Sequence, residues 1–403
     1  MEDLELSLME YVGFHPERDI RPLLDQFEAE HHCRIRVRMI PWETGRAELV
    51  EVALFGRGPE ISEIGTTWCP SYVSMNALRP FTPREVESLG GSSSFLPSSW
   101  QSGKSLDDDQ MWSIPWLAAM RAIFYRRDLL EQAGVDEKTA FLSHPQLIQT
   151  LERLRASSIP TPLVLNTRNI FSPNLHNLAS WVWEAGGGFV SKDGTRTLLN
   201  LPETRAGIRA FLELGQYLSP EARGLDGPQS EALFWQGQAA VSLSWQVPLL
   251  TNLGRFAAPH VIANLGVAPT PGVTFIGGSN LVVWRHIAPS HESLAMDLVR
   301  FLTSQQVQSS YTSQVGFFPV RPEVLQAPPF GTDSFYQFLI QGLKTGRTFQ
   351  AIAQWGLIED RLLRALGQLW ENVLAHPEGD IDAIIAEQLD PLAQRLDHLL
   401  QPT

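Results

Sequence analysis

Aromatic side chains are prominent among the residues of this sequence that could do chemistry. It contains twelve Trp in 403 residues. Four lie at the ends of predicted strands or at predicted chain crossings, and two more lie in predicted helices: Trp68, Trp116, Trp235 and Trp245, then Trp181 and Trp355. Flat indole rings could stack on the apolar faces of a solute whose polar rim is satisfied by nearby side chains. For any one of them a place in the core is an equally good explanation.

Polar residues in the same segments could complete such a site. The candidates are His15, Glu63, Asn166, Ser279, Asn280 and Arg321, together with Gly278. Glu63 and Trp68 lie at the carboxyl end of a short predicted strand, where open α/β sheets bind ligands. Gly278 would permit close approach of a ligand to the backbone, although a tight turn also requires the missing Cβ. Taken singly, such polar residues are more often helix caps, turn residues or solvated side chains.

Enzyme motifs are absent from the sequence. It has no nucleophile elbow, no phosphate-binding loop with its Lys, no G-x-G-x-x-G after a strand and no His or Cys spacing typical of a metal site. We therefore expect no catalysis, no cofactor and no metal. A glycoside hydrolase remains the enzyme alternative, but it would need two carboxylates at a set separation, and no such pair is marked.

The composition of the chain limits the kinds of partner molecule and the cellular compartment that can be expected. A formal net charge of -13 argues against a nucleic-acid partner. No apolar run approaches the ~18 to 20 residues of a membrane-spanning helix. The first residues lack both a basic start and a continuous apolar stretch, so no signal peptide is predicted, and the protein is either cytoplasmic or lacks its export segment here. Cys33 and Cys69 could pair in an oxidising compartment or remain buried thiols.

Hydrophobic periodicity predicts an α/β protein. Leucines alternate over 4–8, helical spacing follows from Ile20 to Phe27, and 34–40 alternates again, which together indicate a right-handed βαβ unit. A chain of 403 residues can form two domains. The stretch 112–136 runs from an apolar strand through small residues into a helix start, as expected of a crossing between two lobes.

Further elements follow in order. Strands are predicted at 59–65, 162–165, 239–244, 262–269 and 275–284, and helices at 47–55, 72–78, 145–154, 174–184, 202–218, 230–237, 289–302, 305–314, 333–343, 355–374 and 381–400. The Gly- and Ser-rich stretch from 90 to 102 is predicted to be a flexible surface segment. Additional crossings between lobes are predicted at 275–284 and 315–322.

Four segments, in this order, resemble a known family. They are 59–64 with Trp68 and 78–81; 114–116 with 125–134; 234–245; and 277–283 with 295–304, Gln308 and 316–321. Together they are similar to the extracellular solute-binding proteins of ABC importers, in the maltose-binding-like, sugar-binding branch. The sequence departs from the family in having no lipid-modified cysteine near its start, and Arg126 and Arg127 replace a more usual Tyr-Asn-Lys type sequence.

The resemblance implies a two-lobe periplasmic-binding-protein type II fold, in which each lobe is a mostly parallel sheet flanked by helices and three hinge crossings join the lobes. The N-terminal lobe would comprise 1–117 plus 274–320, and the C-terminal lobe 118–273 plus 321–403. A monomer is expected to capture a sugar or short oligosaccharide in the cleft between the lobes by hinge closure. The membrane subunits of an ABC transporter would be its partner, outside the cytoplasm. A sensory domain reporting to a signalling protein is the remaining alternative.

Overall fold

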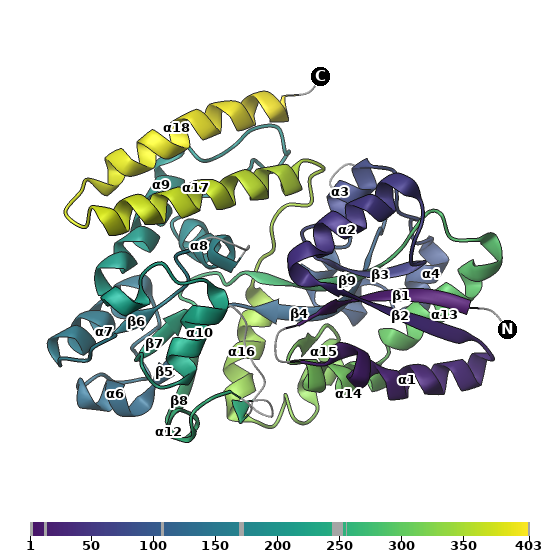
Figure 1. Ribbon diagram of the computed structural model, residues 1–403, viewed down its shortest axis with the longest axis horizontal. Coiled ribbons are helices and arrows are strands. Elements are labelled where there is room, and N and C mark those ends of the chain that lie inside the picture. The colour runs from purple at the N-terminus through teal and green to yellow at the C-terminus, as the bar shows by residue number, and fades with distance from the viewer. Residues whose placement is uncertain are drawn as a thin grey trace. The chain divides into compact units, whose positions relative to one another are not determined.

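The computed structural model describes residues 3–11, 14–105, 109–168, 173–243, 253–254 and 256–401. They form an α/β fold with two β-sheets flanked by helices (Figure 1). The chain divides into two compact units: unit 1 contains 1–119, 276–333 and 348–356, and unit 2 contains 120–275, 334–347 and 357–403. Each unit therefore assembles segments that are far apart in the sequence. In the described part of the chain, no helix has both the length and the apolar character needed to cross a membrane.

The sheet of unit 1 has six strands in the order β10-β4-β9-β3-β1-β2. The strands are β1 (Asp3–Glu10), β2 (Arg34–Pro41), β3 (Ile61–Gly65), β4 (Ile114–Met120), β9 (Ile276–Val283) and β10 (Phe318–Pro319). Strand β1 lies parallel to β2 in a register that places Leu4 opposite Ile35. Its alternating leucines are fully buried. The predicted βαβ unit is thereby confirmed, with α1 as the crossover helix.

Helices cover both faces of this sheet. They are α1 (Pro16–His31), α2 (Trp42–Phe55), α3 (Cys69–Ser74), α4 (Pro83–Ser88), α5 (Pro97–Gln101), α13 (Glu292–Leu302), α14 (Gln305–Val315) and α15 (Pro322–Gln326), with 3-10 turns η1 (Ser92–Ser94) and η4 (Pro289–His291). Figure 1 shows α1, α13 and α14 on one face and α2 and α3 on the other. On the second face Leu49 and Tyr72 pack with Trp284 in one hydrophobic cluster.

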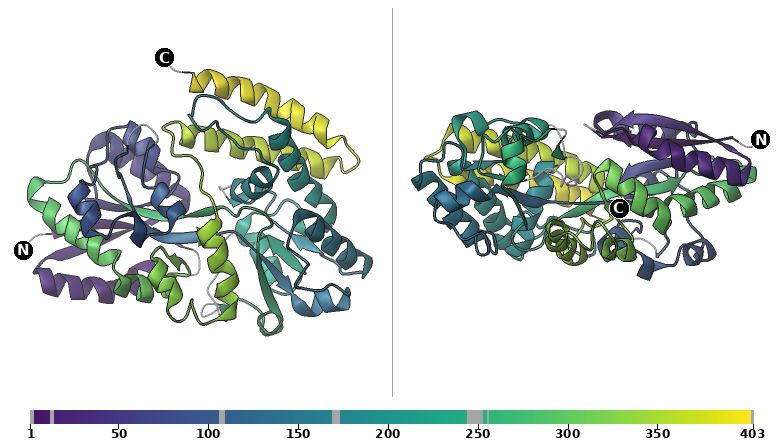
Figure 2. Two further views of the ribbon diagram at one scale, coloured as in Figure 1. Left: turned by 180° about the vertical axis from the view of Figure 1, so that it is seen from behind. Right: turned by 90° about the horizontal axis from the view of Figure 1, so that it is seen from below.

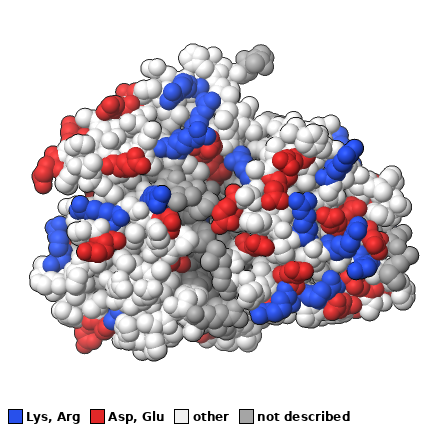
Figure 3. All heavy atoms as spheres, in the orientation of Figure 1, with Lys and Arg blue, Asp and Glu red and all other residues white. Residues whose placement is uncertain are grey.

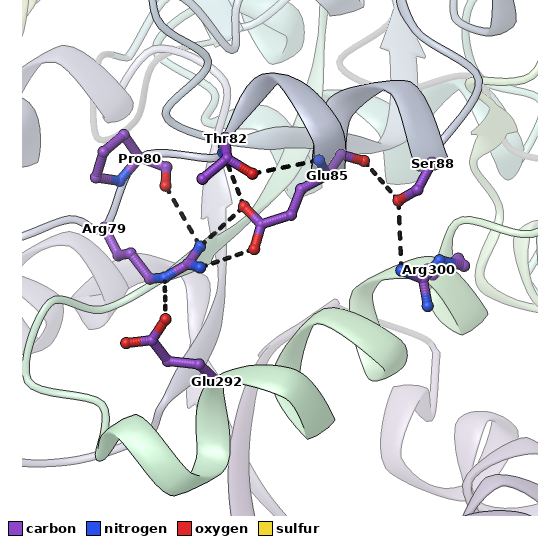
Figure 4. Close-up of polar contacts among 7 residues, drawn as sticks. All are labelled: Arg79, Pro80, Thr82, Glu85, Ser88, Glu292 and Arg300. Atoms are coloured by element: carbon purple, nitrogen blue, oxygen red, sulfur yellow. Dashed lines mark hydrogen bonds and ion pairs between the residues drawn. The ribbon is translucent and has the colours of Figure 1, made fainter.

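An ion-pair network fastens α4 to α13 (Figure 4). The Arg79 guanidinium lies 2.7 Å from Glu85 Oε1 and 3.0 Å from Glu292 Oε2. Glu85 also forms a capping box with Thr82 at the start of α4. Since the Arg79 and Glu85 side chains are only 17% and 19% exposed, the pair is better shielded from water than a typical surface salt bridge.

Arg321 holds the segment after β10 in unit 1. Its guanidinium donates hydrogen bonds to the carbonyl oxygens of Thr303 and Leu89, at 2.8 and 3.0 Å, and lies over the Phe95 ring at 4.2 Å. Burial lowers the pKa of this guanidinium from its usual value. The division drawn from the sequence placed everything after Val320 in the second lobe, whereas 321–333 and 348–356 cluster with unit 1. These hydrogen bonds are one physical reason for the difference.

The sheet of unit 2 has four strands in the order β6-β7-β5-β8. They are β5 (Ala122–Arg126), β6 (Leu163–Val164), β7 (Val241–Leu243) and β8 (Leu265–Pro269). Strands β6 and β7 are parallel, and β5 is antiparallel to both β7 and β8. The central strand β5 is buried along its whole length, as its run of apolar and aromatic residues suggests.

The helices of unit 2 are α6 (Arg127–Gln132), α7 (His144–Ala156), α8 (Pro173–Glu184), α9 (Pro202–Leu212), α10 (Gly227–Trp235), α12 (Pro259–Ala263), α16 (Ser334–Thr345), α17 (Trp355–Ala375) and α18 (Ile381–Leu400), with η2 (Glu213–Tyr217) and η3 (Pro220–Ala222). Helices α17 and α18 run antiparallel side by side (Figures 1 and 2). Helix α9 packs closely on α8, because a Cβ at Gly207 would lie 2.6 Å from the Val182 backbone.

The strand directions in the two sheets differ from the prediction that each sheet is mostly parallel. Both are mixed, not mostly parallel, since β9 is antiparallel to β3 and β10 to β4 in unit 1, and β5 is antiparallel to both neighbours in unit 2. The reason lies in the connections. Strands β4, β5 and β9 lie at the boundaries where the chain passes between units, at 119/120 and 275/276, and are not joined to their neighbours by helical crossovers.

Two local predictions were wrong. The predicted strand 262–269 begins with helix α12, and only Leu265–Pro269 is a strand, because Pro259 starts a helical turn. The segment predicted to be a flexible surface stretch contains helix α5, in which Ser99 is buried. Ser102, just after this helix, is also buried and accepts a hydrogen bond from Asn280 Nδ2 at 3.0 Å. The Gly and Ser content indicated flexibility, but burial of Trp100 fixes the helix.

Charges of both signs are interspersed on the face of unit 1 formed by α1 and β2 (Figure 3). Arg34, Arg36 and Arg38 are the exposed residues that alternate along β2. Arg38 lies 3.0 Å from a Glu48 carboxylate oxygen. Such alternating charge protects an edge strand from pairing with another chain.

Candidate functional site

Four aromatic rings meet at one edge of the unit 1 sheet. The Tyr11 ring lies 5.8 Å from Trp42 and 4.6 Å from Phe317, and Trp42 lies 5.0 Å from Trp68, all measured between centroids. We call Tyr11, Trp42, Trp68 and Phe317 the aromatic shelf. Tyr11 and Trp42 are partly exposed, whereas Trp68 and Phe317 are largely buried behind them.

Strand topology brings these rings together. Tyr11 follows β1, Trp42 follows β2, and Trp68 comes three residues after β3. Because these three strands are parallel, their carboxyl ends lie at the same edge of the sheet, which is where open α/β sheets bind ligands. The fourth ring, Phe317, follows Gly316, which ends α14 at a φ of 78° that other residues rarely adopt.

Glycine at position 65 leaves room for the Trp68 ring of the shelf. A Cβ there would lie 3.0 Å from the Trp68 ring, closer than side-chain contacts normally allow. The absence of a side chain thus lets the indole fold back over the end of β3. This close approach accounts for the glycine with which β3 ends.

Glu63 lies beneath the shelf and is fully buried in β3. Its carboxylate accepts a hydrogen bond from the Met9 backbone N–H at 2.8 Å and another from the Tyr11 hydroxyl. Burial raises the pKa of Glu63 to about 7, while hydrogen bonds from Ser279, Tyr11 and Met9 act in the opposite direction. The pKa of the Tyr11 hydroxyl is raised well above its usual value, first by burial and then by the nearby Glu63 charge.

A hollow of about 620 Å³ adjoins the shelf in unit 1. It is lined by Glu10, Tyr11, Phe14, His15, Pro16, Glu17, Arg18, Met39 and Glu43. His15, predicted to be a site residue, lies here at the start of α1 and is exposed. Three of the lining residues are acidic and one is Arg, so the hollow favours a neutral or cationic solute over an anionic one.

The shelf and hollow together offer two kinds of contact. Tyr and Trp rings can pack against C–H faces, while carboxylates, imidazole and phenol can exchange hydrogen bonds with hydroxyl groups. In the described residues no group of three or more His, Cys, Asp or Glu could hold a metal ion. The arrangement therefore suits a polyhydroxylated solute held by stacking and hydrogen bonds.

Unit 2 contains a second cluster of aromatic and charged groups. The His176 ring stacks on Phe275 at 4.0 Å, and Arg347 lies over the Trp183 ring at 4.8 Å. Arg121 Nη2 lies 2.7 Å from His176 Nδ1. Because a guanidinium can only donate, Nδ1 accepts, and the imidazole proton resides on Nε2.

Burial controls the charge of this second cluster. It lowers the pKa of His176 to about 4, with the Arg121 charge adding to the effect and Glu359 opposing it. His176 Nε2 faces Glu359 Oε1 at 3.6 Å. Burial also lowers the pKa of Arg121 to about 9. The imidazole is therefore neutral at physiological pH and fixes the orientation of its two neighbours.

Four predicted site residues come together in unit 1, namely His15, Glu63, Trp68 and Ser279. Ser279 lies opposite Gly65 in the β9–β3 register, on the strand beside Glu63. Its side chain is 1% exposed. It therefore faces the buried carboxylate beneath the shelf and not solvent.

Other predicted residues of unit 1 have structural partners. The Trp116 ring is buried within β4 and stacks on Tyr311 at 5.2 Å, so it lies inside the strand that leads to the passage between units and not at a strand end. Asn280 is buried and donates to the hydroxyls of Ser102 and Ser113. Gly278 has a φ of 120°, and a Cβ there would lie 2.0 Å from a carbonyl oxygen of β4, so strand packing explains it.

Arg321, another predicted site residue, donates its hydrogen bonds to backbone carbonyl oxygens. Trp355 is buried and packs against Phe349, with ring centroids 4.4 Å apart. In unit 2, Trp181 stacks on His144 at 4.5 Å. Trp235 is within α10, not at a strand end.

Asn166 is buried just after β6. Trp245 lies outside the described residues.

Sequence reasoning missed three members of the shelf. In the structure Tyr11 directly follows β1, Trp42 directly follows β2, and Phe317 comes two residues after α14, much as Trp68 comes soon after β3. The signal that could have found them is this shared position at an element's end, combined with the parallel pairing of β1, β2 and β3. From the sequence, Tyr11 is assigned to a loop, and Trp42 lies between the predicted strand 34–40 and the predicted helix 47–55.

Comparisons with known proteins agree on the type of molecule. The family described as bacterial extracellular solute-binding protein matches residues 16–309. A binding protein of Brucella abortus (strain 2308) is 22% identical over 370 residues, covering 90% of this chain and 85% of that protein.

Among solved structures, the sugar-binding protein MalE of Xanthomonas citri has a TM-score of 0.82 at 19% identity, covering 99% of this chain and 97% of the other. The maltose-bound MalE3 of T. maritima has a TM-score of 0.82 at 18% identity, covering 99% and 100%. At this level of identity the two likenesses establish the fold, which is the predicted type II periplasmic-binding-protein fold.

Proposed function

The chain belongs to the bacterial extracellular solute-binding proteins, and from that premise we propose that it captures a sugar or short oligosaccharide for an ABC importer. Members of this family are binding proteins and not enzymes, and they act outside the cytoplasm. Capture between two lobes by hinge closure, with recognition of the closed form by the membrane subunits, is part of the proposal.

The observation that carries the choice of solute is the aromatic shelf. Two partly exposed rings, Tyr11 and Trp42, stand at the carboxyl ends of parallel strands with carboxylates beside and beneath them. A sugar has apolar C–H faces that suit such rings and hydroxyl groups that suit such acceptors. The sugar-binding and maltose-bound proteins named above support the same solute class.

We assign direct contact with the solute to Tyr11, Trp42 and His15, with Trp68 and Phe317 supporting the two exposed rings. Glu63 and Ser279 act through Tyr11, because both are buried beneath it. A micromolar affinity corresponds to about 8 kcal/mol in total. A central aromatic contact commonly supplies about 2 kcal/mol of such a total, which is the share we expect of Trp42.

A thermal-shift screen tests the proposal. The panel contains mono-, di- and trisaccharides, sugar alcohols and glycerol phosphates. A solute at a hundred times its dissociation constant adds about 2.7 kcal/mol to stability, or a few degrees in a chain of this size. We expect a saturable shift with one carbohydrate class that is weakened in Trp42→Ala. The matched control is Phe55→Ala, since Phe55 is an exposed ring of the same unit outside the shelf. Shifts with glycerol phosphates alone, or an equal loss in both variants, would contradict the proposal.

A further inference from the structure

Glu63 occupies an unusual position for a carboxylate. It is fully buried in the central part of the unit 1 sheet, yet one of the hydrogen bonds that it accepts comes from a residue of the aromatic shelf. Oxygen Oε2 accepts from the Met9 backbone, and oxygen Oε1 accepts from the Tyr11 hydroxyl. The carboxylate thus joins the interior of the sheet to a partly exposed ring that faces the hollow.

The protonation state of Glu63 determines whether the Tyr11 hydroxyl can donate a hydrogen bond to a solute. An ionised carboxylate has no proton to give, so the Tyr11 O–H must point at Oε1. When Oε1 carries a proton, the carboxyl group donates to the phenolic oxygen, and the Tyr11 O–H is released to donate elsewhere. Oxygen Oε2 keeps its bond from Met9 N–H in both states. One proton on Oε1 therefore frees the Tyr11 O–H, which the ionised carboxylate holds, to donate to another acceptor.

We propose that Glu63 positions the Tyr11 hydroxyl for the solute, and that binding of a carbohydrate is coupled to uptake of one proton by Glu63. The inference rests on the proposed function and concerns the same site. In the bound state the Tyr11 O–H donates to a hydroxyl oxygen of the carbohydrate, and the proton taken from water resides on Glu63 Oε1.

The neighbours of Glu63 favour this coupling. Tyr11 follows β1, Ser279 lies on the adjacent strand β9, and Tyr311 of α14 is close enough that its pKa is raised by Glu63 after burial. Asp19 of α1 acts on Tyr311 in the same direction. In the part of the chain that the structure describes, no cation contributes to the pKa of Glu63. Among those residues, no positive charge therefore holds the carboxylate ionised.

Binding of a carbohydrate should itself favour protonation of Glu63. A carbohydrate lying on the shelf excludes water from above Tyr11, which further disfavours the charged form of the group beneath it. The pKa of free Glu63 is about 7, so near neutral pH a large fraction of the free protein is ionised and can take up a proton. Affinity should consequently rise as the pH falls, by about sixfold between about pH 8 and about pH 6 if binding raises the pKa by a little over one.

The experiment has two arms. In the first, infrared spectra of the unliganded protein are compared with those of Glu63→Gln at about pH 5 and about pH 9, where the carboxyl should be protonated and ionised. We expect a carboxylic-acid C=O band in the more acidic spectrum that the variant lacks. In the second, maltose is titrated calorimetrically near neutral pH in two buffers that differ in ionisation enthalpy, which reports the protons taken up on binding.

We expect uptake of a fraction of a proton by the wild type and by Glu51→Gln, a control that removes an exposed carboxylate from α2. Glu63→Gln and Tyr11→Phe should bind with no uptake. The second variant keeps the ring and the carboxylate, so it tests the coupling even if Glu63→Gln fails to fold.

Absence of the acid band, or binding without proton uptake in the wild type, would overturn the inference and leave the proposed function standing. Failure of maltose and of every screened carbohydrate to bind would instead overturn the proposed function, and the inference with it. The two failures are therefore distinguishable.

Discussion

Replacement of Glu63 by Gln should change the pH dependence of stability. The pKa of Glu63 is raised from 4.5 to about 7 in the folded protein, chiefly by burial. Between these values the folded state holds a proton that the unfolded state has lost, so this stabilisation is lost as the pH rises through about 7. At about 1.4 kcal/mol for each pKa unit, the wild type should lose about 3 kcal/mol relative to Glu63→Gln across this window.

The variant suits the comparison because Gln resembles the protonated acid. Its amide oxygen can accept from Met9 N–H, and its amide N–H can donate to the Tyr11 oxygen. Urea unfolding of both proteins, followed by Trp fluorescence from about pH 5 to about pH 8, gives the difference in unfolding free energy at each pH. Other titrating groups cancel in this difference, and Glu51→Gln serves as the surface control. A difference that stays constant across the range would refute our account of Glu63.

Three further predictions concern stability and accessibility. Arg321→Met should cost about 3 kcal/mol in urea unfolding, because it leaves buried backbone carbonyls without their donor. Gly278→Ala should destabilise by more than about 2 kcal/mol in the same assay, since its φ of 120° and the nearby β4 carbonyl exclude a Cβ. Cys33 and Cys69 are buried and form no disulfide, and burial raises the pKa of Cys69 to about 12, so neither thiol should react with Ellman's reagent until the protein is denatured.

Each of these three predictions has its own control variant or contradicting result. Arg321→Lys keeps the charge but loses the planar fork, and it should recover only part of the stability. Gly134 also has a positive φ, of 65°, but nothing lies within 4 Å of a Cβ there, so Gly134→Ala should cost only about 1 kcal/mol. Rapid labelling of a thiol in the native protein would show that the interior is more open than the structure indicates.

Most elements could be predicted because their periodicity is local. The alternation of β2 and the helical spacing of α1 are set by residues within one element, and both boundaries lie within a few residues of the prediction. Strand direction was less predictable, since it depends on where each connection enters the sheet. Helix α12 was missed because Pro259 can start a helix or interrupt a strand, and the apolar residues after it fit either.

The site was predictable only in part, for a related reason. Trp68 and Glu63 could be selected because both lie near the end of one recognisable strand. Tyr11, Trp42 and Phe317 come from three other connections, and only parallel pairing and the return of α14 place them beside Trp68. The sequence also gave no sign that the strand of Trp116 continues to Met120, which buries that ring against Tyr311. Convergence of distant segments is a tertiary property that periodicity does not report.

The central claim is that a carbohydrate rests on the aromatic shelf, and indole N–H signals report on this most directly. Isotope-labelled protein is titrated with maltose, and the signals of Trp42 and Trp68 are compared with that of Trp100, which packs against Phe95 in the same unit. Our account predicts saturable shifts for Trp42 and Trp68 and little change for Trp100. Saturable binding that leaves the Trp42 and Trp68 signals unmoved would contradict it.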